Sequence, residues 1–373
     1  MKRTLVVKVG TSLLRGQDGV EPAGFVAELA ANLCAERRRG SGVALVTSGA
    51  VGLGCAELGL AQRPQLVEEL QAVAAIGQGQ LMGLYESAFR PHGQTVAQVL
   101  ITRGDMASRR RFQNASRTLK QLLAWGVLPI VNENDTLATE ELRFGDNDSL
   151  SALVAVALGA NELILLTDVD RLYSADPRSD SRAEPISEVR NLAELDALHQ
   201  VAGGGGSWGT GGMTTKLAAA RIATASGIAV RLADGRDPRI LSELLNGTNH
   251  GTLFLPSPSP IPDRKGWLAH ALVPKGRLSI DKGAETALLS QGASLLCVGV
   301  RRVDGSFEAQ EPVVILAEDG RELARGLSSL DSAALCAGAG QRDSGIAVHR
   351  DQLVITAVDT ASLAHSPTIP AIP

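Results

Sequence analysis

Two lysines stand in settings that favour contact with an anion. Lys216 closes the glycine-rich stretch GTGGMTTK, and a helix-forming run, LAAARIATA, follows directly. Glycine lets the backbone approach a ligand closely, and a helix N-terminus presents unpaired N–H groups and the positive end of its dipole. Lys8 lies within the apolar run LVVKV, where burying an ammonium group is costly unless it meets an anion. Together they predict a polyphosphate site that is not of the Walker type, since no glycine immediately precedes Lys216.

Each signal also has a purely structural interpretation. The glycine-rich stretch could be a flexible linker, and Lys8 could extend its ammonium group to solvent from the end of a strand. The two signals together favour the functional interpretation. Two cations that approach a transferring phosphoryl group from different sides would neutralise the charge that builds on its oxygens.

Two polar clusters, Asn132–Asp135 and Gly145–Asp148, lie close together in the sequence. A solvated turn with an Asx cap would explain either cluster alone. Two clusters at the ends of adjacent elements instead suit a site that grips an ammonium and a carboxylate while it holds a magnesium nucleotide. Within such a site Asp148 could orient both lysines without moving a proton.

Hydroxyl and carboxyl groups follow two further apolar runs. Ser48 precedes a glycine and an alanine and could hold an anionic substrate group, or it could simply cap the next helix. Thr167 and Asp168 end the run LILLTD and could hydrogen-bond a ribose or an adenine edge, with a plain turn as the alternative.

The elements that must position these residues are apolar runs that alternate with helical stretches over about the first 250 residues. We expect buried parallel strands at 5–9, 43–48, 96–102, 127–133 and 163–168. We expect helices that include 22–38, 65–90, 112–125, 147–159 and 214–226. This alternation predicts an α/β fold with a mainly parallel sheet between helices. Functional groups should gather at the carboxyl ends of its strands.

The domain organisation follows from a change in composition along the chain. We expect the α/β domain over residues 1–255, a linker marked by Pro and Ser over 256–275, and a small, mostly β domain over 276–356. Residues 357–373 contain Pro and Ala without periodicity, so we expect a disordered tail there.

Composition narrows the classes of function. A net charge of −4 gives no electrostatic footprint for nucleic acid or for an anionic membrane. The apolar run at the start is too short for a signal peptide, and no run approaches the length of a membrane span. The four cysteines form no CxxC pair, so we expect reduced thiols, no metal site and a cytoplasmic location.

The motifs of the chain, taken in order, resemble the glutamate 5-kinase family of the amino-acid kinase superfamily. They are KVGTS, VTSGAVGLG, AAIGQGQLM, FQNASRTL, VNEND, FGDNDSLSALVA, LLTDVDRLYSADPR and GTGGMTTK. The C-terminal module resembles a PUA domain through LSIDKGAETALLSQGASLLCVGV, VDGSF, GRELARGLSSLDSAAL and AVHRDQLV. The resemblance implies phosphorylation of the γ-carboxylate of L-glutamate by ATP and Mg²⁺ to L-glutamyl 5-phosphate, the first step of proline biosynthesis. It also implies feedback inhibition by proline and assembly into a homo-oligomer.

The resemblance further assigns roles to residues of this sequence. Lys8 and Lys216 would stabilise the phosphoryl group in flight, and Asp148 would organise them. The set that binds glutamate would be Ser48, Asp135, Asn147 and Asp146. The set that binds the nucleotide would be Lys8, Thr167, Asp168, Thr210, Gly211, Gly212, Met213, Thr214, Thr215 and Lys216.

Three alternatives remain. Another amino-acid kinase, such as an acetylglutamate kinase, would lack the C-terminal module. An RNA-binding protein would use that module, but residues 276–356 contain eight Lys or Arg against eleven Asp or Glu, which gives phosphate backbones little attraction. A pseudoenzyme kept for regulation is disfavoured by the presence of both lysines and all three carboxylates.

Overall fold

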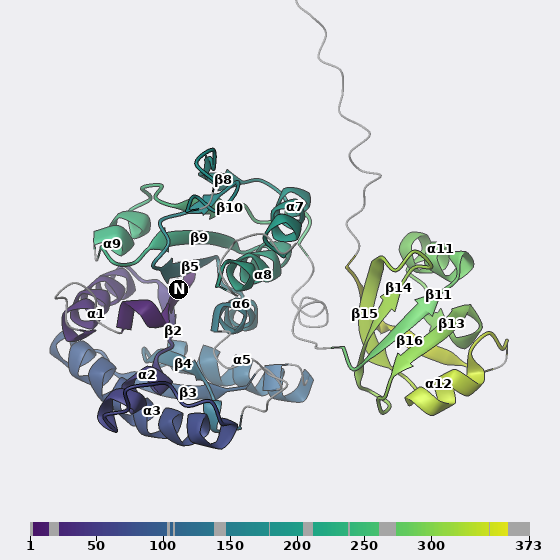
Figure 1. Cartoon of the computed structure of the whole chain (residues 1–373), viewed down its shortest axis with the longest axis horizontal. Helices are drawn as coiled ribbons and strands as arrows, with labels where there is room; N and C mark the ends of the chain where they lie inside the picture. The colour runs from purple at the N-terminus through teal and green to yellow at the C-terminus, as the bar shows by residue number, and fades with distance from the viewer. Residues whose placement is uncertain are drawn as a thin grey trace, which may run out of the picture. The chain divides into compact units, whose positions relative to one another are not determined.

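The structure is a computed structural model that describes residues 3–14, 22–102, 105–106, 109–137, 147–178, 180–203, 212–237, 239–260, 274–342 and 344–356. The chain divides into two compact units, Met1–Ala271 and Leu272–Pro373. Figure 1 labels most of their helices and strands.

The N-terminal unit is built on an eight-stranded sheet with the spatial order β3-β4-β2-β1-β5-β9-β10-β8. Neighbouring strands are parallel except for β9 and β10. The strands are β1 (Thr4–Val9), β2 (Gly42–Val46), β3 (Val96–Ile101), β4 (Leu128–Glu133), β5 (Glu162–Thr167), β8 (Glu188–Val189), β9 (Ala229–Asp234) and β10 (Thr252–Phe254). Strands β1, β2, β4 and β5 are buried along nearly their whole length, as apolar strands covered by helices on both faces must be.

Helices cover both faces of this sheet (Figure 1). One layer contains α1, α3 and α9, with α2 packed on α3, and the other contains α5, α6, α7 and α8. The bounds are α1 (Pro22–Arg38), α2 (Ala50–Glu57), α3 (Val67–Phe89), α5 (Arg109–Ala124), α6 (Asn147–Leu158), α7 (Leu192–Gly203), α8 (Gly212–Ala225) and α9 (Arg239–Leu245). Helix α6 is buried at every residue because it contacts the sheet, α5 and α8.

Helices α2 and α3 approach each other more closely than any side chain would allow. A Cβ added at Gly77 of α3 would lie 1.8 Å from the carbonyl oxygen of Ala50, and one added at Gly54 of α2 would lie 1.9 Å from the carbonyl oxygen of Val73. The two backbones therefore touch. This contact fixes the start of α2, directly after β2, against the middle of α3.

The described part of this unit also contains three short 3₁₀ helices and a small hairpin. They are η1 (Thr11–Leu14), η2 (Arg90–His92), η3 (Asp135–Leu137) and the antiparallel pair β6 (Leu172–Tyr173) and β7 (Pro185–Ile186). The expectation of an α/β fold with a mainly parallel sheet between helices is confirmed. In the described ranges no helix combines the length and the apolar character needed to cross a membrane.

The C-terminal unit contains a six-stranded sheet with the order β12-β16-β15-β14-β11-β13. Its strands are β11 (Gly276–Ile280), β12 (Leu295–Leu296), β13 (Val300–Gly305), β14 (Pro312–Leu316), β15 (Glu322–Ser328) and β16 (Ile346–Ile355), with η4 (Cys297–Gly299) before β13. The mostly β character was expected. Two helices of this unit were not expected, α11 (Lys282–Gln291) and α12 (Ser332–Gly338). Each begins after an aspartate whose side chain accepts a backbone N–H.

Parts of the predicted linker and tail lie outside the described residues. These are 261–273, within the linker predicted over 256–275, and the whole of 357–373. All four cysteines are free thiols.

Candidate active site

One buried carboxylate holds both of the lysines singled out in the sequence. Lys8 Nζ in β1 lies 2.6 Å from Asp148 Oδ1, and Lys216 Nζ in α8 lies 3.3 Å from Asp148 Oδ2. Asp148 stands in the first turn of α6. Three elements far apart in the sequence thus bring two ammonium groups to one carboxylate.

The charges of this cluster fix its protonation. Burial alone would raise the pKa of the Asp148 carboxyl. The charges of Lys8 and Lys216, with hydrogen bonds from Lys8 and from Thr215 Oγ1 at 2.8 Å, outweigh burial and lower that pKa to about 2. Asp148 therefore stays ionised near neutral pH. It holds side by side two cations that would otherwise repel each other.

Lys216 also contacts the start of its own helix. Its Nζ donates to the carbonyl oxygen of Gly212 at 3.1 Å, so the side chain folds back over the first turn of α8. The ammonium group and the N-terminal end of α8 thus lie together, and both favour a negative ligand. Met213 and Thr214 are half-buried in the same turn.

A second cluster consists of neutral polar side chains and adjoins the first, because Asn147 directly precedes Asp148. Asn147 Nδ2 donates to Ser48 Oγ at 3.0 Å and to Asn132 Oδ1 at 3.1 Å. Asn132 Nδ2 in turn donates to Gln78 Oε1 at 2.7 Å. Ser48, Asn132 and Asn147 are 5%, 1% and 4% exposed, so these contacts are shielded from water. The structure brings together Ser48 and Asn147, which the resemblance assigned to glutamate.

Asp135 lies apart from this cluster. It opens η3, which packs against α3, and in the described chain no hydrogen bond or ion pair joins it to Ser48 or Asn147. Burial raises the pKa of the Asp135 carboxyl to about 6, although the charge of Arg63 lowers it in part. A cation that arrives with a ligand would therefore favour the ionised form of this carboxyl.

The end of β5 places Thr167 and Asp168 beside β1. Thr167 is buried and donates through Oγ1 to Asp168 Oδ1 at 3.1 Å, whereas Asp168 is exposed. An exposed carboxylate at a strand end is available to a ligand at this edge of the sheet. Three predicted site residues, Asp146, Thr210 and Gly211, lie outside the described residues.

Sequence reasoning gave no role to two members of the polar cluster. Asn132 lies in the cluster Asn132–Asp135, which we noted without assigning its first member. Gln78 lies in the motif AAIGQGQLM, where a glutamine in a helical pattern reads as an ordinary polar position. Its signal is indirect: a glycine precedes it, and that glycine marks the close approach of two helices.

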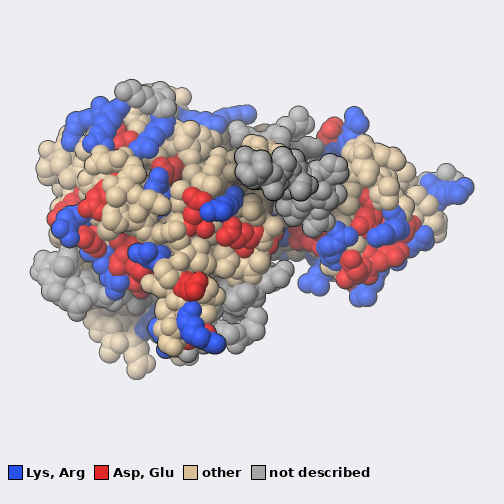
Figure 2. All heavy atoms as spheres, turned by 90° about the horizontal axis from the view of Figure 1, so that it is seen from above, with Lys and Arg blue, Asp and Glu red and all other residues tan. Residues whose placement is uncertain are grey.

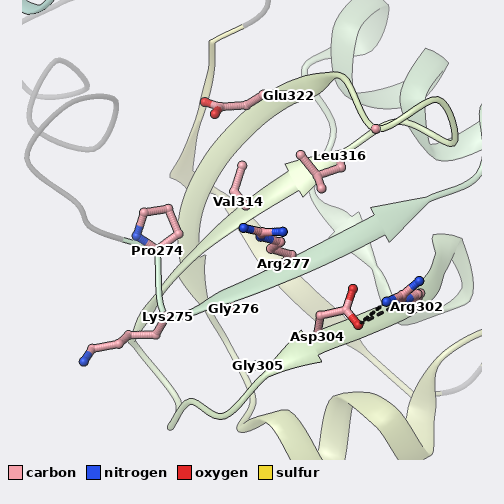
Figure 3. A pocket seen from close by; sticks show the side chains of 11 residues that line it. Pro274, Lys275, Gly276, Arg277, Arg302, Asp304, Gly305, Val314, Leu316 and Glu322 are labelled. Atoms are coloured by element: carbon pink, nitrogen blue, oxygen red, sulfur yellow. Dashed lines mark hydrogen bonds and ion pairs between the residues drawn. The ribbon is translucent and has the colours of Figure 1, made fainter. Parts of the chain in front are cut away.

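The C-terminal unit has a cavity of its own, of about 850 Å³ (Figure 3). Arg277 of β11 lies between Val314 of β14 and Asp304 of β13, and Asp304 pairs with Arg302 at 2.8 Å. Side chains of both signs also intermingle on the face of this unit that Figure 2 shows. This mixture of charges differs from the lysine pair of the N-terminal unit.

Comparison with known proteins also divides the chain into an N-terminal and a C-terminal part. Residues 3–234 match the Amino acid kinase family, and residues 276–347 match the PUA domain. The chain is 61% identical over 354 residues to a glutamate 5-kinase of Prochlorococcus marinus (strain MIT 9313), covering 94% of this chain and 98% of the relative. It is 60% identical, with the same coverage, to a glutamate 5-kinase of Synechococcus sp. (strain CC9605). A glutamate 5-kinase of Synechococcus elongatus is 48% identical over 95% of this chain and 100% of the relative.

Proposed function

The chain belongs to the amino acid kinase family, and within it to the glutamate 5-kinases, so we infer that it transfers the γ-phosphoryl group of ATP to the side-chain carboxylate of L-glutamate. The product is L-glutamyl 5-phosphate, the first intermediate of proline biosynthesis. The observation that carries this function is the lysine pair on Asp148, which directly adjoins the polar cluster around Asn147.

The chemistry requires two anions to be brought together. The side-chain carboxylate of glutamate is already ionised at neutral pH, so its oxygen can attack the γ-phosphorus without a general base. As that bond forms, the bond from the γ-phosphorus to the bridging oxygen breaks and ADP leaves. We propose that Lys8 and Lys216 neutralise the charge that this transfer spreads over the phosphoryl oxygens.

We assign Asp148 a positioning role. It aims both ammonium groups at one point, and its low pKa keeps it from taking a proton from either lysine or from the substrate. Positioning of this kind is a large part of catalysis when a reaction involves little covalent chemistry for the protein to perform.

We place the nucleotide between the start of α8 and the end of β5. The residues are Gly212, Met213, Thr214, Thr215 and Lys216, with Thr167 and Asp168 across from them and Thr210 and Gly211 added by the resemblance. Mg²⁺ would enter bound to the phosphates and neutralise part of their charge. In the chain as described, no group of three His, Cys, Asp or Glu side chains is placed to hold a metal ion.

We place glutamate over the polar cluster, with its side-chain carboxylate toward the lysines. Ser48 and Asn147 would bind its α end. Asp135 would attract its ammonium group, and the resemblance adds Asp146.

We further propose a homo-oligomer, feedback inhibition by proline and a cytosolic location. Exposed apolar side chains gather at the connection from α2 to α3, where Leu58, Leu60 and Leu66 are 50%, 42% and 56% exposed, a composition that suits a face covered by a second copy. Four free cysteines suit a reducing compartment. Light scattering with and without proline tests the assembly, and the steady-state rate tests the inhibition.

The test of the function is ATP consumption with L-glutamate, with the acyl phosphate trapped by hydroxylamine. N-acetyl-L-glutamate and L-aspartate serve as competing substrates. Hydroxamate from L-glutamate alone is expected. Hydroxamate chiefly from N-acetyl-L-glutamate would leave the fold assignment intact and contradict L-glutamate as the substrate.

A further inference from the structure

We propose that Gln78 binds the α-carboxylate of glutamate, and thereby selects acceptors with a free α-carboxylate. This inference rests on the proposed function and names a residue for one of its steps. It follows from the direction of the hydrogen bonds in the polar cluster and from the atoms that those bonds leave over.

A backbone group fixes that direction. The N–H of Glu133 donates to Asn132 Oδ1 at 2.9 Å, and a backbone N–H can only donate. The Asn132 oxygen is thereby identified, so Asn132 Nδ2 must face Gln78 and Gln78 must present Oε1 to it. By the same logic Asn147 donates to Asn132 through Nδ2. Turning over Asn132 or Gln78 would set donor against donor, and turning over Asn147 would set acceptor against acceptor.

With the amides oriented in this way, two of their polar side-chain atoms remain unpaired in the described structure. Gln78 Nε2, a donor, and Asn147 Oδ1, an acceptor, are each buried without a hydrogen-bond partner in the described structure. A buried polar group that lacks a partner costs on the order of 1–3 kcal/mol, so a ligand that pairs with it recovers that cost. A donor suits a carboxylate, and an acceptor suits an ammonium group. Both groups occur on the α carbon of an amino acid.

The fold brings Gln78 to this place through its neighbour. Gly77 contacts the backbone of Ala50, so residue 78 emerges from α3 beside the first turn of α2. The residue before that turn, Gly49, has φ of 101° and supplies no side-chain cap. Free N–H groups at the start of α2 would therefore add to the Gln78 amide in binding a carboxylate.

The position of the lysines decides which carboxylate of glutamate this is. The reacting carboxylate must lie beside Lys8 and Lys216, which both bind Asp148. From Asn147, the residue before Asp148, the amide chain leads to Asn132 and then to Gln78 at its far end. The carboxylate at Gln78 is therefore the one on the α carbon.

The test is Gln78→Glu. The new carboxylate still accepts from Asn132, but it removes the donor and repels a carboxylate. L-Glutamate and its α-amide, L-isoglutamine, are compared as substrates, or as competitors where turnover is slow. The KM for L-glutamate should rise on the order of 10- to 100-fold, with kcat within about threefold. The KM or inhibition constant for L-isoglutamine should change by less than about threefold, because its amide can donate to Glu at position 78.

Gln80→Glu is the matched control, since Gln80 lies on the same helix and is exposed. It should leave both constants unchanged. Equal losses for both ligands in Gln78→Glu, or no change, would overturn the proposal. These constants do not depend on the fraction of folded enzyme, so poor folding would not mimic the expected result. A wild-type enzyme that makes no hydroxamate from L-glutamate would instead overturn the proposed function itself.

Discussion

Asp148 organises the proposed phosphoryl-transfer site through its ion pairs with Lys8 and Lys216. A buried ion pair gains little stability by itself, because each charge loses its water on burial. The gain here is geometric: two flexible lysine side chains are held with their ammonium groups on one carboxylate. In the reaction that we propose, the phosphates would meet cations already in place, so little ordering would be left for the transition state.

The first prediction concerns Lys216→Ala. The loss of one of the two cations should lower kcat on the order of 100-fold or more, while the KM for glutamate stays within about threefold. Lys120→Ala, an exposed lysine on α5, is the control. Steady-state rates with each substrate varied in turn check this. Near-normal turnover in Lys216→Ala would contradict our assignment of the start of α8.

The second prediction is a pH dependence that originates at Asp135. Burial favours its protonated form, so below about pH 6 the free enzyme should carry a neutral Asp135 that no longer attracts the substrate ammonium. The KM for glutamate should then rise by up to about tenfold per pH unit as pH falls below about 6, with kcat little changed. Asp135→Asn should show a high KM that no longer varies with pH in this range. A wild-type pH profile in that variant would remove Asp135 from the substrate site.

At the level of single residues, the sequence predicted the lysine pair but not the amide chain. Lys8, Asp148 and Lys216 stand out because a charged residue beside an apolar run requires a partner. Asn132 and Gln78 do not stand out, because neutral amides occur in any turn or helix. Their role depends on side-chain orientations that a backbone N–H of another residue fixes.

Among the elements, the contact between α2 and α3 should be the most sensitive to added bulk. Gly77→Ala would drive a methyl group into the backbone of Ala50, so we expect a loss of about 1–3 kcal/mol in the free energy of unfolding and a raised KM for glutamate. Gly79→Ala on the same helix meets no atom within 4 Å, so it should be neutral or stabilising by up to about 1 kcal/mol. Denaturant unfolding and glutamate kinetics of both variants check this. Equal stabilities of the two variants would contradict the close approach.

The same contact marks the limit of prediction at this scale. Periodicity located β1, β2, β4 and β5 to within about two residues, because buried strands and covering helices impose different patterns on a sequence. It could not show that α2 and α3 touch. That contact depends on Gly54 and Gly77 meeting backbone atoms that lie more than 18 residues away. Periodicity did not predict the helices α11 and α12, because they are short and lie among strands.

On the scale of the molecule, the two units have separate hydrophobic cores. The core of the N-terminal unit includes Leu33 and that of the C-terminal unit includes Leu335, both fully buried. A ligand stabilises the part of a protein that binds it. The active site described here belongs entirely to the first unit.

The last prediction follows from these two cores. In calorimetry, Leu33→Ala and Leu335→Ala should each remove about 2–5 kcal/mol from its own unit and lower a different transition. Glutamate with an unreactive ATP analogue should raise the transition that Leu33→Ala lowers and leave the other in place. A ligand shift of the transition that Leu335→Ala lowers would instead place the C-terminal unit in the binding equilibrium.

The adjacency of Asn147 and Asp148 on one helix has a consequence for how such enzymes diversify. Asp148 contacts the lysines to which we assign phosphoryl transfer, and Asn147 contacts the amide chain to which we assign the choice of acceptor. Changes around Asn147, Asn132 and Gln78 can therefore explore new acids while Lys8, Asp148 and Lys216 remain untouched. An engineer who wishes to redirect this catalyst should mutate Gln78, Asn132 and Asn147 and leave Asp148, the next residue of α6, in place.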